Sequence, residues 1–162
     1  MNTAIYPGTF DPITYGHIDV IKKSLNVFDR VIVATTDNIN KNYHFSIEDR
    51  IKIIHNSLFK DLGFKKKKIK VISFDDLTID LCKKYKANTI IRGLRAVSDF
   101  EYEFQLAGMN KKLNSKIETM FLMSDVENQI ISSKFVKEIA SLGGNINRFV
   151  TRSTVKMLKN KI

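Results

Sequence analysis

Short apolar runs alternate along the chain with segments in which apolar residues recur every three or four positions. The runs are rich in β-branched and aromatic residues, and their near-continuous apolarity is typical of strands covered on both faces. They predict strands at residues 3–6, 31–35, 69–74, 89–91 and 119–123. The periodic segments predict amphipathic helices at residues 17–27, 47–62, 79–85, 100–113, 133–142 and 154–160.

The alternation of strands and helices predicts the fold class. Strands separated by helices of this length imply right-handed βαβ units, and therefore an α/β fold with a Rossmann-like, doubly wound sheet of about five parallel strands flanked by helices. No internal repeat or linker interrupts the pattern, so we expect one domain over residues 1–162. In such sheets, ligands bind beyond the carboxyl ends of the strands.

The charge balance points to an anionic partner. The chain has 162 residues, and 27 Lys and Arg against 17 Asp and Glu give a formal charge of +10. Lysine is scattered over every segment, and the dense run at residues 65–68 lies in a predicted turn without the interleaved aromatic residues of a nucleic-acid platform. We therefore expect no nucleic-acid partner, although a basic nucleic-acid-binding module stays the alternative from a different functional class.

Two compositional features concern the environment of the protein. The single cysteine, Cys82, excludes an internal disulfide and a Cys-rich zinc site. No apolar run approaches the ~20 residues that cross a bilayer, and the first residues lack the basic-then-apolar layout of a signal peptide. We expect a soluble, cytoplasmic protein with no membrane partner.

The stretch after the first predicted strand, residues 6–17, carries the first candidate chemistry. Both prolines of the chain, Pro7 and Pro12, fall within it, so the turn is stiff and lies where a ligand should arrive. Gly16 would let a phosphate approach the free N–H groups of the following helix, and His17 would donate to the same phosphate. The chain has neither a GxxxxGK[ST] loop nor a GxGxxG fingerprint, which argues against a P-loop ATPase and against standard dinucleotide binding.

Two motifs resemble a known family. TYGH at residues 14–17, preceded by YPGTFDP at residues 6–12, resembles the T/HxGH motif of the nucleotidyltransferase superfamily. IRGLRAVSDFEYE at residues 91–103 closely resembles the signature of the bacterial phosphopantetheine adenylyltransferases, which is far more specific. Together with residues 131–133 and 136–138, the resemblance covers nearly the whole chain.

The resemblance implies an enzyme that transfers adenylate reversibly from ATP to 4′-phosphopantetheine, the penultimate step of coenzyme A biosynthesis. The products are dephospho-coenzyme A and pyrophosphate. The attacking phosphate, whose second pKa is about 6, is already ionised at neutral pH, so direct in-line attack needs no general base and no covalent intermediate. Catalysis then consists of aligning two anions and stabilising charge on the α-phosphoryl oxygens, for which cations and N–H donors are suited.

The resemblance also implies roles for individual residues. It implies catalytic roles for His17, as transition-state stabiliser, and for Thr9, Lys41 and Arg92. The implied ATP-binding residues are Thr9, Phe10, His17, Gly93, Leu94, Arg95, Glu103, Asn128, Gln129, Ile130, Ile131, Ser132, Ser133 and Lys134. The implied phosphopantetheine-binding residues are Thr9, Lys41, Thr78 and Arg92.

The chain departs from the family pattern at residues 128–134. The family has an aromatic residue and a serine before the motif and a third serine after it, whereas this chain reads NQIISSK with Lys134 at the end. Glu103 lies on a predicted helix, where a solvated carboxylate is the ordinary outcome. The aromatic residues Phe100, Tyr102 and Phe104 are expected to be core or subunit contacts rather than a nucleotide site.

The implied cofactor is Mg²⁺, carried with ATP, because this ion prefers phosphate oxygens and water. No metal cage appears in the sequence, and His44 and His55 have no ligating spacing. The family forms hexamers as paired trimers, so the resemblance implies a homohexamer. Among enzymes, the open alternative is a related nucleotidyltransferase that uses another phosphorylated acceptor, such as nicotinamide mononucleotide or glycerol phosphate, with a different base.

Overall fold

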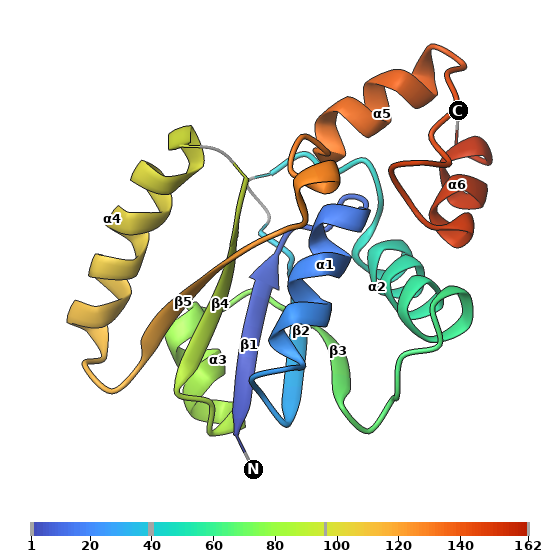
Figure 1. Cartoon of the computed structure of the whole chain (residues 1–162). Coiled ribbons are helices and arrows are strands. Elements are labelled where there is room, and N and C mark those ends of the chain that lie inside the picture. Colours follow the sequence, from blue (N-terminus) through green and yellow to red (C-terminus); the bar gives the residue numbers. More distant parts are fainter. Residues whose placement is uncertain (1, 39–40, 96, 162) are drawn as a thin grey trace.

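The computed structural model describes residues 2–38, 41–95 and 97–161. In this described part, one parallel sheet runs through the molecule (Figure 1). Its strands are β1 (Thr3–Gly8), β2 (Arg30–Thr36), β3 (Ile69–Phe74), β4 (Thr89–Leu94) and β5 (Glu118–Met123). They lie in the order β3-β2-β1-β4-β5, which confirms the predicted α/β fold with five parallel strands.

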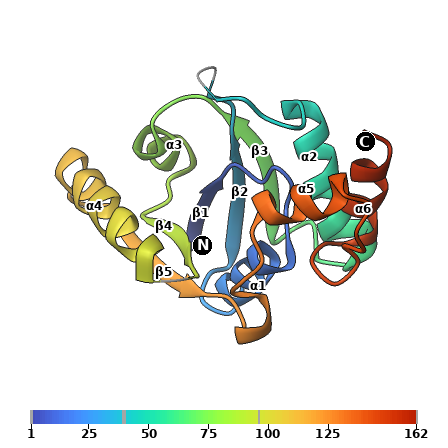
Figure 2. The same cartoon turned by 90° about the horizontal axis from the view of Figure 1, so that it is seen from above.

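Helices cover both faces of the sheet, as Figure 2 shows from above. The α-helices are α1 (Tyr15–Ser24), α2 (Ile47–Asn56), α3 (Thr78–Tyr85), α4 (Val97–Leu113), α5 (Ser133–Ser141) and α6 (Arg152–Lys159). The helices α3 and α4 lie on one side of the sheet, and α1, α2, α5 and α6 lie on the other. A short π-helix, η1 (Ser57–Asp61), extends α2, and a short 3-10 helix, η2 (Val126–Asn128), follows β5.

Side-chain alternation along the central strands gives each face its own core. Ala4 and Tyr6 pack with residues of α1 and α2 in one buried cluster, whereas Ile5 packs with Ile79 and other residues of α3 in a second cluster. Since successive side chains of a strand point to opposite faces, β1 is covered on both sides, as its apolar sequence predicts.

The strand order reverses next to β1, between β1 and β4. Pairing between these two strands covers only Ala4 with Thr89 and Ile5 with Ile90, although β4 continues alongside β5 as far as Leu94. The carboxyl ends of β1 and β4 are therefore not paired with each other in the sheet. In doubly wound sheets this switch point is where ligands bind, so the topology directs attention to it.

Several element ends differ from the predicted ones. The strands β1 and β4 run on to Gly8 and Leu94, because pairing with β2 and β5 continues through residues with low intrinsic strand preference. The helix α4 begins at Val97, three residues before the predicted start. Among the described residues, no helix has both the length and the apolar character needed to cross a membrane.

Candidate active site

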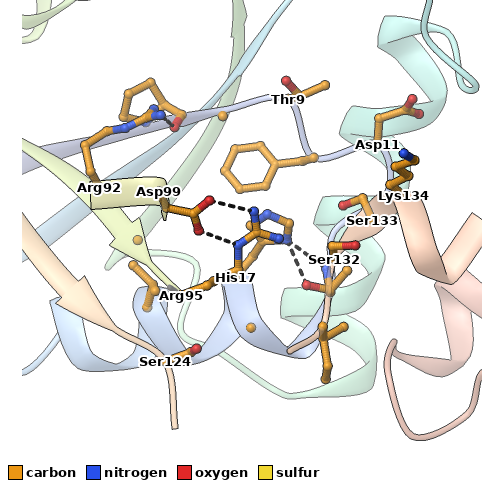
Figure 3. Close-up of a pocket in the computed structure, with 18 of the residues that line it drawn as sticks. Thr9, Asp11, His17, Arg92, Arg95, Asp99, Ser124, Ser132, Ser133 and Lys134 are labelled. Carbon is orange, nitrogen blue, oxygen red and sulfur yellow. Dashed lines mark hydrogen bonds and ion pairs between the residues drawn. The ribbon is translucent and has the colours of Figure 1, made fainter. Parts of the chain in front are cut away.

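A cavity of about 600 Å³ lies beyond the carboxyl ends of β1 and β4 (Figure 3). Its walls come from the turn after β1, the start of α1, the loop after β2, the end of β4 with the start of α4, and the start of α5. Most of the predicted site residues line it, namely Thr9, Phe10, His17, Lys41, Arg92, Gly93, Leu94, Arg95, Glu103, Ile131, Ser132, Ser133 and Lys134. Segments far apart in the sequence thus meet at the predicted edge.

His17 lies in the first turn of α1, in the middle of this group (Figure 3). Its Nδ1 accepts a hydrogen bond from the backbone N–H of Thr14 at 3.0 Å, and the Thr14 hydroxyl lies 3.0 Å from the same atom. Because Nδ1 is an acceptor, the neutral ring carries its proton on Nε2. The chain thus fixes both the ring and the tautomer, and Nε2–H is a donor for a ligand.

Burial, together with the neighbouring guanidinium groups of Arg95 and Arg92, lowers the pKa of His17 to about 4. The imidazole is therefore neutral at physiological pH. A neutral ring donates one hydrogen bond without competing with the arginines for the charge of a bound phosphate. This arrangement suits a donor to a phosphoryl oxygen better than a proton shuttle.

The lowered pKa of His17 gives a prediction for an NMR titration. An ordinary histidine changes charge around pH 6.5, whereas the His17 ring signals should stay constant down to pH 5.5 and titrate near pH 4. Since the unfolded chain binds this proton near pH 6.5, folding stability falls as the pH drops from there toward 4, and this loss levels off below the folded pKa. The His17→Gln variant assigns the signal, and a midpoint above pH 6 would contradict the assignment.

The ring of Phe10 packs against the ring of His17. Its side chain is buried, and its ring meets those of Tyr6 and His17 edge-on, with centroids 5.3 Å and 5.1 Å apart. A Cβ added at Gly8 would lie 2.8 Å from the Phe10 ring, so glycine is required there. The backbone of Phe10 has φ +47°, the left-handed region. Only its backbone is therefore suited to contact a nucleotide.

Arg92 at the end of β4 is held by a fork of hydrogen bonds. Its Nε and Nη2 donate to the two carboxylate oxygens of Glu103 at 2.6 Å and 2.5 Å, and its Nη1 donates to the carbonyl of Pro7 at 2.9 Å. Glu103 on α4 is 8% exposed. The carboxylate of Glu103 is thus engaged in orienting Arg92, a role that the sequence did not indicate.

Arg95 follows β4 and pairs with Asp99 across one turn. Its Nε lies 3.1 Å from the nearer carboxylate oxygen, and both side chains are partly exposed (Figure 3). An exposed pair of this kind contributes little to stability, so a phosphate readily replaces the carboxylate. Arg95 is therefore available to an anionic ligand in the cavity.

The start of α5 supplies backbone donors. Ser132 caps the helix, since its hydroxyl accepts from the N–H of Phe135 at 3.1 Å, and the Ser133 hydroxyl donates to the carbonyl of Pro12 at 2.7 Å. These contacts hold the first turn of α5 against the turn after β1. The free N–H groups of that helix end favour an anion, and Lys134 adds a cation at the rim.

The remaining predicted residues lie further out. Gln129 and Ile130 line a second cavity of about 580 Å³, which shares Arg95, Asp99, Ser132 and Lys134 with the first. Asn128 and Thr78 line neither cavity.

Asn128 has an internal role instead. Its side-chain Nδ2 donates to Asp19 at 2.7 Å, and its backbone carbonyl oxygen would lie 3.1 Å from a Cβ at Gly16. The room that glycine leaves at position 16 is thus used by the protein's own loop, whereas the sequence suggested room for a phosphate.

Asp11 lines the cavity but was not singled out from the sequence. Its carboxylate accepts from the N–H groups of His44 at 2.7 Å and Phe45 at 2.9 Å, and from Lys137 at 3.1 Å. Burial alone would raise the pKa of Asp11, but the two N–H bonds and Lys137 lower it overall. Its partners lie more than 30 residues away in the sequence, so no local pattern could have revealed the role.

The sequence was compared with known proteins. Residues 5–139 match the Cytidylyltransferase-like family. The phosphopantetheine adenylyltransferase of Pelagibacter ubique (strain HTCC1062) is 69% identical over 158 residues, which cover 98% of this chain and 96% of the relative. That of Legionella pneumophila (strain Lens) is 49% identical over 158 residues, covering 98% and 90% respectively.

The fold was also compared with solved structures. The Plasmodium falciparum nicotinic acid mononucleotide adenylyltransferase complexed with NaAD superimposes with a TM-score of 0.71 at 19% identity, covering 98% of this chain and 95% of the other. At 19% identity, this likeness supports the fold alone. The identities of 69% and 49% over nearly the whole chain show the family. The chain belongs to the phosphopantetheine adenylyltransferases, within the cytidylyltransferase-like nucleotidyltransferases.

Proposed function

We propose that the chain transfers adenylate from ATP to 4′-phosphopantetheine, giving dephospho-coenzyme A and pyrophosphate. The observation that carries the proposal is the neutral His17 ring, fixed in one tautomer, in the same cavity as Arg92, Arg95 and Lys41. This set supplies donors and cations, and the carboxylates that line the same cavity are ion-paired; attack by an already ionised phosphate needs no base.

In the proposed step, a phosphate oxygen of phosphopantetheine attacks the α-phosphorus of ATP. A new phosphorus–oxygen bond forms as the bond to the β-phosphate breaks, and pyrophosphate leaves with the electron pair. His17 donates from Nε2 to an α-phosphoryl oxygen, on which negative charge grows, and keeps its proton throughout. Arg95, Lys134 and the N–H groups at the start of α5 hold the leaving phosphates.

The acceptor side of the cavity is formed by Arg92, Lys41 and Thr9. We propose that Arg92, oriented by Glu103, and Lys41 bind the phosphate of phosphopantetheine and bring it into line. Thr78 lies outside the cavity wall, so its contact with the pantetheine arm stays a prediction, as does the contact of Asn128 with ATP.

We propose Mg²⁺ as the ion that accompanies ATP. Within the described residues, no group of three or more His, Cys, Asp or Glu side chains has the arrangement of a metal site. The carboxylates at the cavity are each paired, Asp11 with Lys137, Asp99 with Arg95 and Glu103 with Arg92. The residues present therefore fit an ion held by nucleotide phosphates and water, where it neutralises phosphate charge.

An acceptor assay tests the proposed function. Purified protein is incubated with Mg²⁺ and either ATP or CTP. Separate reactions contain phosphopantetheine, nicotinamide mononucleotide or glycerol phosphate, and the products are identified by mass spectrometry. We expect dephospho-coenzyme A and pyrophosphate in the reaction with ATP and phosphopantetheine, and no product with the other acceptors. Product only with another acceptor would replace the proposal with the alternative nucleotidyltransferase, and salt-sensitive nucleic-acid binding without any product would support the non-catalytic alternative.

The exposed apolar side chains of α4 support a proposed homo-oligomer, which the family resemblance implies is a hexamer. Phe100, Tyr102, Phe104, Met109 and Leu113 on this helix are 45% to 66% exposed. They are therefore not core residues of the single chain, and large apolar side chains exposed in this number on one helix are typical of an interaction site. The cytoplasmic location expected from the sequence likewise stays a prediction.

Replacing one of these exposed aromatic residues should weaken the assembly. We expect Phe104→Glu to shift the molar mass, measured by light scattering after size-exclusion chromatography, toward smaller species, because a carboxylate would be buried against apolar surface. Lys112→Glu, a change at an exposed polar position of the same helix, is the matched control and should leave the mass unchanged. A wild-type protein that is monomeric at micromolar concentration would contradict the proposed assembly.

A further inference from the structure

Arg50 on α2 is completely buried, with 0% of its surface exposed. A charged side chain is very seldom fully buried unless its donors are paired, because removing the charge from water is costly. Replacing a buried ion pair by apolar residues is often neutral or stabilising, so stability alone is a weak explanation for such a residue. The contacts of Arg50 give a better one.

The guanidinium of Arg50 reaches two different segments of the chain. Its Nη1 lies 3.1 Å from the carbonyl oxygen of Thr9, 2.7 Å from that of Thr36 and 3.2 Å from the hydroxyl oxygen of Thr35. Its Nη2 donates to a carboxylate oxygen of Asp37 at 3.1 Å. One buried side chain thus joins the turn after β1 to the end of β2 and the loop that follows it.

The loop side carries a second contact. The guanidinium carbon of Arg50 lies 3.8 Å from the centre of the Tyr43 ring, the distance of a close cation–π contact. Tyr43, Asn42 and Lys41 all line the large cavity. Through Tyr43 and Asp37, Arg50 therefore contacts the loop on both sides of Lys41, the residue proposed to bind the acceptor phosphate.

The turn side concerns the peptide between Thr9 and Phe10. The two ends of a trans peptide unit, C=O and N–H, point in opposite directions. Since the Thr9 carbonyl faces Arg50 and also accepts from the Thr35 hydroxyl at 3.0 Å, the Phe10 N–H is turned away from them. Both Thr9 and Phe10 line the cavity, and Phe10 holds an unfavourable positive φ. Arg50 thus stabilises the orientation of this peptide, which forms part of the cavity wall.

We propose that Arg50 is a positioning residue that holds the nucleotide-binding turn and the acceptor-binding loop in a fixed relation. It touches neither substrate and acts through the Thr9–Phe10 peptide and through the loop that carries Lys41. A planar fork with several donors and a stacking face is needed for this, which a lysine ammonium does not provide. The inference rests on the proposed function, because it assigns the two segments to the two substrates.

The first test is Arg50→Lys, which keeps the charge but loses the fork. We expect the KM values for both ATP and phosphopantetheine to rise and kcat to fall by ~10–100-fold, since small misplacements of both phosphates are costly. Lys52→Met, at an exposed position of the same helix, is the matched control and should change neither KM nor kcat. Circular dichroism and the melting temperature show whether Arg50→Lys is folded. A folded variant with all constants within about twofold of wild type would overturn the proposal.

A narrower variant, Asp37→Asn, weakens only the loop contact of Arg50. It should raise the KM for phosphopantetheine severalfold and leave the KM for ATP unchanged, whether or not Arg50→Lys folds. An unchanged KM for phosphopantetheine would overturn the loop half of the proposal.

A double-variant cycle separates positioning from a general structural role. If Arg50 acts through Lys41, the effect of Arg50→Lys on the KM for phosphopantetheine should largely disappear in a Lys41→Ala background, whereas its effect on the KM for ATP should persist. Additive effects on both constants would contradict the proposal.

The wild-type reaction in the same assay checks the proposed function itself. If the wild-type protein forms no dephospho-coenzyme A, the ATP affinities of wild type and Arg50→Lys, measured by calorimetry, still test whether Arg50 positions the turn at Thr9 and Phe10. Weaker binding by Arg50→Lys supports the turn half of the proposal, and equal affinity overturns it.

Discussion

His17→Ala should lower kcat for dephospho-coenzyme A formation by a factor of about 10²–10³, the usual cost of removing a preorganised transition-state donor. The KM for either substrate should change much less, because the donor acts where charge develops and not in ground-state binding. The ring lies at the surface of the cavity, so its loss should leave the fold intact. Steady-state rates at saturating substrate, with pyrophosphate release as the signal, measure the effect.

Two further variants serve as controls for this result. His55→Ala removes a histidine of α2 whose ring meets that of Phe59 edge-on and which does not line the cavity, so the turnover of this variant should equal that of wild type. His17→Gln offers an amide donor in place of the imidazole and should retain part of the lost rate. Turnover of His17→Ala within tenfold of wild type would mean that another group stabilises the transition state.

The second large effect is expected from Arg92→Ala. Losing a charge-assisted fork to phosphate should raise the KM for phosphopantetheine by roughly 10–100-fold. The change also leaves the buried carboxylate of Glu103 without its partner, and this negative charge would repel the incoming phosphate. The double variant Arg92→Ala with Glu103→Gln should therefore bind phosphopantetheine better than Arg92→Ala alone.

Kinetics of the single variant Glu103→Gln distinguish two roles for this carboxylate. The observed fork predicts a higher KM for phosphopantetheine, because Arg92 loses its orientation. The family resemblance implied a contact with ATP instead. A selective rise in the KM for ATP would favour that direct contact and contradict the orienting role.

The sequence predicted the parts of the fold that depend on local pattern. The strand at Ile69–Phe74 was predicted at its observed bounds, because an apolar, β-branched run identifies a buried strand. The helix α4 was predicted less well at its start, since it is apolar on several faces and residues such as Phe100 and Phe104 are exposed. A helix whose outer face is also apolar gives a weak periodic signal.

The candidate site divides in the same way. His17 stood out because it follows the first strand within a stiff turn, and a topological rule connects that place to a ligand. The partners of Asp11 and Arg50 did not stand out, because several of them lie 33 to 126 residues away and meet only once the sheet has formed. The pairing of Glu103 with Arg92 likewise depends on how α4 returns across β4, which residue spacing does not reveal.

The central claim is that the neutral imidazole of His17 donates a hydrogen bond to an oxygen of the phosphoryl group under attack. A crystal structure of the protein with dephospho-coenzyme A tests it most directly, because the product contains the transferred phosphoryl group. We predict an oxygen of that group within about 2.7–3.2 Å of His17 Nε2, with Arg92 on the acceptor side. A product whose phosphates lie beyond the reach of Nε2, or an Nε2 bonded to the protein itself, would contradict the account.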